Sequence, residues 1–136
     1  MRIKLLDGAF MPLRAHKTDA GLDLLSPVHA YIPAKGSACI DTGVCVELPP
    51  KTVGMVKSKS GLNVKHGITS EGVIDVGYTG SIRVKLYSHS DVDYYVNRGD
   101  KISQLVIMPI LTPKLELVDE LEETERGSNG FGSTGY

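Results

Sequence analysis

Closely spaced turn residues are the feature that most constrains the fold of this chain. Its 136 residues include 15 glycines and 7 prolines, and short runs rich in Val, Ile and Leu lie between them. Within residues 82–87, Ile82, Val84 and Leu86 alternate with other residue types, as in a strand with one buried face. Many short strands separated by turns predict an all-β antiparallel sandwich or barrel.

Other segments agree with this prediction. One short helix is expected at residues 60–66, with Ser60 as its N-cap. Residues 38–48 form two apolar pieces on either side of an Asp-Thr-Gly sequence at residues 41–43. Three further runs are expected to be strands, at residues 28–32, 92–96 and 102–110.

Composition narrows the class of protein. The length indicates one domain, and the net charge of −1 argues against direct nucleic-acid binding, which needs a basic surface. No apolar run approaches the ~20 residues of a membrane span, and the first residues lack a hydrophobic leader. Cys39 and Cys45 are too few for a disulfide framework. These observations predict a cytoplasmic protein that binds neither nucleic acid nor membrane.

The C-terminal part changes in character. Residues 116–125 carry six acidic side chains and no basic one, and residues 126–136 are rich in glycine. Arg126 could bind a phosphate through its guanidinium fork, and Phe131 could stack on a base. The residues alone leave two interpretations open: a flexible tail, or an arm that orders on a nucleotide.

Two internal segments contain candidate binding or catalytic residues. Residues 57–61 (Lys-Ser-Lys-Ser-Gly) lead into the expected helix, where backbone N–H groups can bind an anion; a plain helix start is the alternative. Residues 72–80 contain Asp75 and Tyr78 among glycines. Asp75 could act as a general base and Tyr78 as a wall of the site, whereas a hairpin turn is the structural interpretation.

Two more segments each contain one polar residue within apolar sequence. Asp23, in residues 20–24, must be paired, solvated or linked to a metal if it is buried. Gln104 lies in the run that follows the turn at Gly99 and Asp100. Taken singly, both are better explained by structure than by function.

Together, in this order, the segments resemble the five motifs of the trimeric dUTPase family. Residues 20–25, 57–61, 72–80, 98–105 and 126–135 are similar to the first to fifth motifs, and the likeness runs from about residue 12 to the end. It implies that residues 1–125 form a distorted antiparallel jelly-roll that contains one short helix. It also implies a homotrimer in which the arm, residues 126–136, closes over a neighbouring subunit's active site.

The resemblance implies Mg²⁺-dependent hydrolysis of dUTP to dUMP and pyrophosphate, which would limit uracil incorporation into DNA and supply dUMP. Asp75 and Gln104 would be catalytic, with Asp75 activating the attacking water and Gln104 near the α-phosphate. Asp23 would hold Mg²⁺ through water. The implied substrate-binding residues are Lys59, Ser60, Gly61, Thr69, Gly72, Val73, Ile74, Tyr78, Arg83, Arg126, Phe131, Gly132, Ser133 and Thr134.

The resemblance also implies which part of the nucleotide each of these residues would contact. The main chain around residues 69–73 would recognise uracil, with Phe131 covering the base, and Tyr78 would pack on the deoxyribose. Ser60 and Gly61 would contact phosphates, and the arm would hold the γ-phosphate through Arg126, Ser133 and Thr134.

The sequence departs from the usual motifs at two places. Ser58 and Lys59 stand where the second motif usually has Pro and Arg, and Lys lacks the planar fork of Arg. Gly77 stands where the third motif usually has an acid. Two alternatives therefore stay open: a dCTP deaminase-type enzyme of the same fold, and a catalytically weak, nucleotide-sensing regulatory protein that binds a protein partner.

Overall fold

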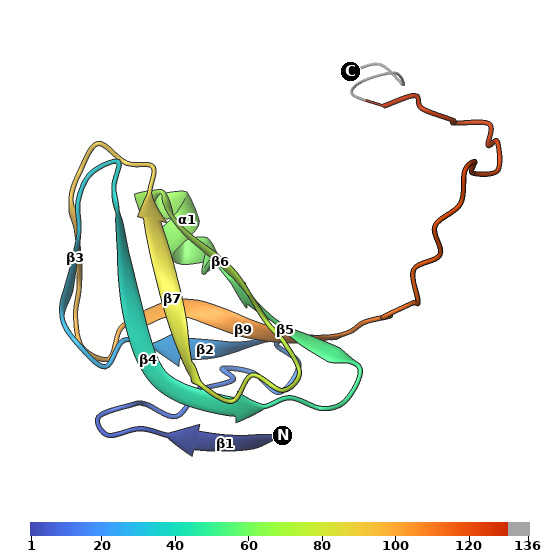
Figure 1. Cartoon of the computed structure of the whole chain (residues 1–136). Coiled ribbons are helices and arrows are strands. Elements are labelled where there is room, and N and C mark those ends of the chain that lie inside the picture. Colours follow the sequence, from blue (N-terminus) through green and yellow to red (C-terminus); the bar gives the residue numbers. More distant parts are fainter. Residues whose placement is uncertain (131–136) are drawn as a thin grey trace.

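Antiparallel strands make up most of the chain. The computed structural model describes residues 1–130. Figure 1 labels the helix and most of the strands, with colours that follow the sequence. The elements are β1 (Arg2–Leu5), β2 (Gly21–Leu25), β3 (Ala30–Ile32), β4 (Ser37–Glu47), β5 (Thr52–Lys57), α1 (Ser60–His66), β6 (Ile68–Ile74), β7 (Ser81–Ser88), β8 (Tyr94–Val96) and β9 (Lys101–Pro109).

Strands that are far apart in sequence pair in the larger sheet. Its order is β1-β4-β7-β6-β5-β9-β2, and every neighbouring pair is antiparallel. The sheet curls around the core, while β3 and β8 form a separate two-stranded sheet at one end (Figure 1). This confirms the predicted antiparallel jelly-roll with one short helix.

The core follows from strand alternation. On β7, Ile82, Val84 and Leu86 are at most 1% exposed, whereas the residues between them face solvent. The inward faces of the other strands meet this row and exclude water from one contiguous apolar cluster, which includes Leu24, Val56 and Leu105. Apolar burial of this kind is the dominant favourable term in folding.

The predicted helix is present at the expected residues, but the expected N-cap is wrong. Lys59 is the N-cap, with extended backbone and no side-chain cap, and Ser60 is the first helical residue. The chain leaves β5 in extended form through Lys59, whose carbonyl accepts a hydrogen bond from Asn63 N–H at 2.9 Å. Gly67 ends the helix in the left-handed conformation (φ 64°), as is usual for glycine.

Several strands were not expected from the sequence. β1, β2, β5 and β6 lack a long alternating run, and in β2, β5 and β6 motif residues obscure the pattern that remains. The segment at residues 38–48 looked divided, but all of it up to Glu47 belongs to one strand, β4, whose register against β7 shifts between Asp41 and Cys45. The divided sequence therefore marks an irregularity within a strand, not a break between strands.

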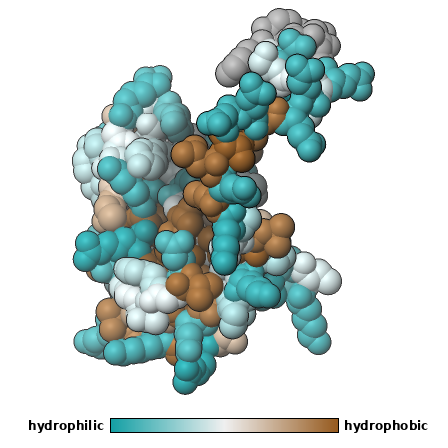
Figure 2. All heavy atoms as spheres, turned by 45° about the vertical axis from the view of Figure 1, so that its right-hand side comes forward, coloured by the Kyte–Doolittle hydropathy of each residue, from teal (hydrophilic) through white to brown (hydrophobic). Residues whose placement is uncertain are grey.

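The segment after β9 leaves the body of the molecule (Figure 1). Its leucines are almost fully exposed, and Figure 2 shows hydrophobic side chains along it. The exposed fractions are 93% for Leu111, 98% for Leu115, 100% for Leu117 and 87% for Leu121. Within residues 1–130, no helix is long and apolar enough to cross a membrane.

The alternation on β7 predicts the effect of a core substitution. Ile82→Ala removes a fully buried side chain, so the free energy of unfolding is expected to fall by about 2–5 kcal/mol. Val64→Ala, at an 83% exposed helix position, is the control, with an expected change within about 0.5 kcal/mol. Urea unfolding at a fixed protomer concentration measures both, and equal effects of the two substitutions would contradict the placement of this core.

Candidate functional site

Gln104 lies where three strands meet. On β9 it faces Asp23 of β2 and Lys57 of β5. Its amide Nε2 donates to the carbonyl of Ser58 at 3.0 Å, so the amide oxygen points the other way. That oxygen rests against Gly21, where any Cβ would overlap it and lie 3.0 Å from Gln104 Cβ. The glycine is therefore required for this orientation of Gln104.

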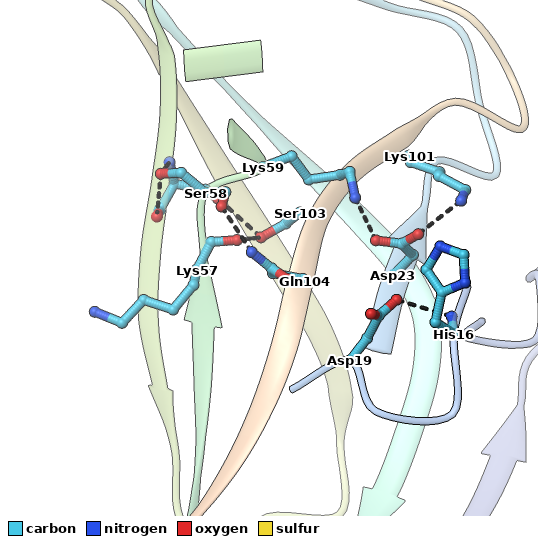
Figure 3. A network of polar contacts seen from close by, with 10 residues as sticks. His16, Asp19, Asp23, Lys57, Ser58, Lys59, Lys101, Ser103 and Gln104 are labelled. Carbon is cyan, nitrogen blue, oxygen red and sulfur yellow. Dashed lines mark hydrogen bonds and ion pairs between the residues drawn. The ribbon is translucent and has the colours of Figure 1, made fainter. Parts of the chain in front are cut away.

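Asp23 is a buried carboxylate held between two ammonium groups (Figure 3). It is 6% exposed; Lys101 Nζ lies 2.7 Å from its Oδ2, and Lys59 Nζ binds Oδ1. Burial raises the pKa of Asp23, but hydrogen bonds and charge attraction from Lys101 and Lys59 outweigh it, so the pKa falls below its usual value. The three side chains carry a net charge of about +1 at neutral pH.

A chain of hydroxyl groups fixes the turn between β5 and α1 (Figure 3). Ser103 Oγ donates to the carbonyl of Lys57 at 2.8 Å, so Ser70 Oγ, 2.8 Å away, donates to Ser103. Ser58 Oγ donates to the Ser70 carbonyl at 3.0 Å and accepts from Ser70 N–H at 2.9 Å. These bonds hold the carbonyl of Ser58 where Gln104 binds it.

The predicted residues before and inside the helix lie next to this network. Lys59 precedes α1, and Ser60 and Gly61 begin it. A Cβ at Gly61 would meet no atom within 4 Å, so the backbone there is open to a ligand. We call Asp23, Lys59, Ser60, Gly61 and Gln104 the β9 cluster.

The second group of predicted residues surrounds the opening between β6 and β7. These strands pair only at Ile68↔Ser88, Thr69↔Tyr87 and Ser70↔Leu86, and they separate toward the loop at residues 75–80 (Figure 1). Residues 72–74 pair with β5 on their other side. Their backbone groups that point toward β7 therefore lie beyond the end of this ladder.

The loop after β6 holds Tyr78 in one position. Tyr78 N–H donates to the carbonyl of Asp75 at 3.1 Å, and its hydroxyl donates to the carbonyl of Ser81 at 2.9 Å. The ring lies on Gly80, where a Cβ would come 2.7 Å from Tyr78 Cζ. Gly77 has φ 98°, a conformation that an acidic residue rarely adopts. We call residues 72–80 the β6 hairpin cluster.

Asp75 of the β6 hairpin cluster lies apart from Gln104 of the β9 cluster within one chain. Gln104 is level with Lys57, and Lys57 with Glu71, so Asp75 is four residues further along the sheet, about 13 Å at ~3.3 Å per residue. One chain therefore does not bring Asp75 to Gln104.

Other predicted residues lie outside both clusters. Thr69 Oγ1 is 2.9 Å from His89 Nε2, near the end of α1. Arg83 Nε is 3.3 Å from Asp41 Oδ2 on β4. Arg126, in the projecting segment, donates from Nε to the carbonyl of Asn129 at 3.0 Å. Their roles stay predictions, and four more residues lie outside the described part of the chain: Phe131, Gly132, Ser133 and Thr134.

The sequence did not single out two residues of the site. Lys101 binds Asp23, and Gly21 makes room for Gln104. Both lie inside segments already noted, Gly21 beside Asp23 and Lys101 directly after the turn at Asp100. A buried carboxylate needs a cationic partner, but only the pairing of β2 with β9 identifies which one.

Comparison with known proteins decides the family. The family model for dUTPase matches residues 7–135. The chain belongs to the dUTPase family. The deoxyuridine 5'-triphosphate nucleotidohydrolase of Clostridium acetobutylicum is 47% identical over 135 residues, which cover 97% of this chain and 93% of the relative.

Two solved dUTPases share the fold at more than 30% identity. That of Staphylococcus bacteriophage 80alpha, with dUpNHpp, superposes with a TM-score of 0.90 at 34% identity, covering 99% of this chain and 98% of the other. A mutant dUTPase from phage phi11 of S. aureus, described with a structural Mg(II) ion, gives 0.83 at 32% identity and covers 90% of this chain and 98% of its own.

The Asp23 contacts predict a pH-dependent loss of stability. Because the folded pKa of Asp23 is lowered, its stabilisation is complete above the unfolded value of about 3.9 and is lost as the pH falls through the folded value. Asp23→Asn is expected to cost about 1–3 kcal/mol at pH 7, since solvent partly screens Lys101. The difference from the unsubstituted protein is expected to shrink below about pH 4.

Urea unfolding across this pH range, at a fixed protomer concentration, measures the difference. Asp91→Asn is the matched control, because Asp91 pairs with Lys35 at 3.2 Å on the surface, with its side chain 88% exposed. Its expected effect is below about 0.5 kcal/mol. A difference for Asp23→Asn that stays constant down to pH 2 would contradict the lowered pKa.

Proposed function

We propose that this protein hydrolyses dUTP to dUMP and pyrophosphate. Family membership supports the reaction, and one observation supports the substrate. The ladder between β6 and β7 ends at Ser70 and Leu86, before the residues that lead to Asp75 and Tyr78. Among the described residues, the backbone donors and acceptors of residues 72–74 that point toward β7 lie beyond this ladder. They suit the edge of a uracil, as a base-pairing partner would, and Thr69 and Arg83 extend the proposed pocket along the same two strands.

The proposed chemistry is an in-line displacement. A water oxygen forms a bond to the α-phosphorus, the bond from that phosphorus to the bridging oxygen breaks, and pyrophosphate leaves. Asp75 accepts the proton of the water. Because a carboxylate is a weak base, its main contribution is to hold the water in line for attack.

The β9 cluster is proposed to bind the triphosphate. Gln104 lies at the α-phosphate and the attacking water, and Ser60 and Gly61 offer hydroxyl and backbone donors. Lys59 supplies positive charge, held by Asp23, without the bidentate geometry of an arginine. The arm completes the site, with Arg126, Gly132, Ser133 and Thr134 on the γ-phosphate and Phe131 over the base.

We infer that Mg²⁺ enters with the nucleotide, as Mg·dUTP. The described residues contain no group of three His, Cys, Asp or Glu side chains that could hold a metal ion, and Mg²⁺ commonly takes its ligands from substrate phosphates and water. A carboxylate has about four lone-pair sites, of which the lysines use two on Asp23. Asp23 can therefore also accept hydrogen bonds from Mg²⁺-bound water.

The nucleotide preference is tested by pyrophosphate release from dUTP, UTP, TTP and dCTP with Mg²⁺. We expect strong selectivity for dUTP, because the proposed packing of Tyr78 on the deoxyribose would exclude a 2′-hydroxyl. Asp75→Asn is expected to lower kcat by roughly 100-fold or more while dUTP binding is largely kept. Removal of Mg²⁺ with EDTA is expected to stop turnover.

Three outcomes would contradict the proposal. Release of ammonia from dCTP would indicate a deaminase. Binding of dUTP without hydrolysis of any nucleotide would favour the nucleotide-sensing regulatory protein. Turnover by Asp75→Asn near the unsubstituted rate would remove Asp75 as the general base. Asp93→Asn, directly before β8, controls for the loss of a carboxylate elsewhere.

We infer further that the active form is a homotrimer with shared active sites. Within one chain Asp75 lies about 13 Å along the sheet from Gln104, so facing subunits are needed to bring these two residues together. The exposed leucines after β9 require a partner surface. The free edge of β1, with an adjoining groove of about 450 Å³ that reaches Thr79, offers such a surface on a second copy.

Mixing two inactive variants tests the sharing of sites. Deletion of residues 126–136 is expected to lower turnover by roughly 100-fold or more, and Asp75→Asn is expected to be inactive. Unfolded and refolded together, they are expected to regain turnover, because a complete arm from one subunit then closes over an intact Asp75 of another. Each variant refolded alone is the control, and mixtures that stay inactive, although mixed trimers form, would contradict shared sites.

A further inference from the structure

The irregularity in β4 lies directly opposite the start of β7, where the loop bearing Tyr78 ends. β4 and β7 pair at Asp41↔Arg83 and again at Cys45↔Ser81. Residues 42–44 of β4 therefore stand opposite Ile82 alone. Extra residues of this kind bend a strand and redirect nearby side chains.

Side chains of the bulge replace the missing ladder bonds. Thr42, fully buried, donates from Oγ1 to the carbonyl of Ile82 at 2.7 Å and accepts from Val44 N–H at 3.2 Å. Asp41 Oδ1 accepts from Gly43 N–H at 3.0 Å. Gly43 has φ 68°, which suits a glycine. The bulge is thus a fixed structure.

Asp41 also reaches across to the tyrosine loop. Ser81 Oγ donates to Asp41 Oδ1, and Arg83 Nε lies 3.3 Å from Oδ2. The hydrogen bond from Ser81 is the largest of the interactions that lower the pKa of Asp41, so this group is a carboxylate at neutral pH. Oδ1 of Asp41 accepts hydrogen bonds from Ser81 and from the bulge, and Oδ2 pairs with Arg83.

Ser81 joins this carboxylate to the tyrosine. Its hydroxyl binds Asp41, and its carbonyl accepts the hydroxyl proton of Tyr78 at 2.9 Å. The tyrosine ring also lies on Gly80, within 2.7 Å of where a Cβ would be. A shift of Ser81 therefore moves the hydroxyl end of the ring.

We propose that Asp41 is a positioning residue for Tyr78, which by holding Ser81 fixes the tyrosine ring against the sugar and sets the preference for dUTP over UTP. This inference rests on the proposed function. Rejection of one added hydroxyl depends on how closely the wall of the site packs on the sugar. If Ser81 could shift, the ring would pack less closely on the sugar and the 2′-hydroxyl would be rejected less strongly.

The test is the ratio of kcat/KM for dUTP to that for UTP, together with the ratio of Kd values for their non-hydrolysable imido analogues. Asp41→Ala is expected to lower both ratios by about 10-fold, mainly through better use of the ribonucleotide. Ser81→Ala, which keeps the carbonyl, is expected to shift them in the same direction. Asp41→Asn keeps an oxygen acceptor and is expected to retain discrimination.

Two comparisons separate positioning from a general structural effect. Asp93→Ala is the matched control, because Asp93 likewise accepts a backbone N–H, from Ala34 at 2.8 Å, but lies beside β8; its ratios are expected not to change. In a Tyr78→Phe background, which lacks the hydroxyl, Asp41→Ala is expected to cause no further change.

Failure of the positioning role and failure of the proposed function would give different results. Folded Asp41→Ala and Ser81→Ala proteins that hydrolyse dUTP with unchanged ratios would overturn the positioning role, as would equal losses for both nucleotides. If Asp41→Ala does not fold, Ser81→Ala decides by itself. An unsubstituted protein that neither hydrolyses nor binds dUTP would overturn the proposed function and this inference with it.

Discussion

The pairing of β5 on both of its edges is the constraint on which the rest of the site depends. Its backbone bonds to β9 on one side and β6 on the other, so it fixes the levels of Gln104 and Glu71 against Lys57. A slip of one residue would turn the buried face of β5 to solvent. The core therefore sets the register, and the register sets the separation of Asp75 from Gln104 along the sheet.

Charge in this protein is arranged locally. The chain as a whole carries a net charge of −1, yet the buried carboxylate of Asp23 binds two lysines. Burying Asp23 costs free energy unless it is paired, and Lys59 and Lys101 offset that cost while keeping part of their length in solvent. A site for a polyanion can arise in this way without a basic surface.

The β6 hairpin cluster depends on backbone conformations that few residue types allow. Gly77 and Gly80 permit the tight turn and the close approach of the Tyr78 ring. The bulge in β4 faces the same region from the neighbouring strand. Bulges are common next to active sites because they redirect side chains, and here the bulge contacts the residue that receives the hydroxyl of Tyr78.

Alternation, turn residues and motif order are local properties of the chain, and they were enough to predict the fold class, the helix at residues 60–66, the buried face of β7 and the family. The folded structure alone shows that Lys101 binds Asp23 and that Asp75 lies far from Gln104 within one chain. It also decided that the Asp-Thr-Gly sequence at residues 41–43 is a bulge. The physical reason is that alternation tells which face of a strand is buried but not which strand pairs with it.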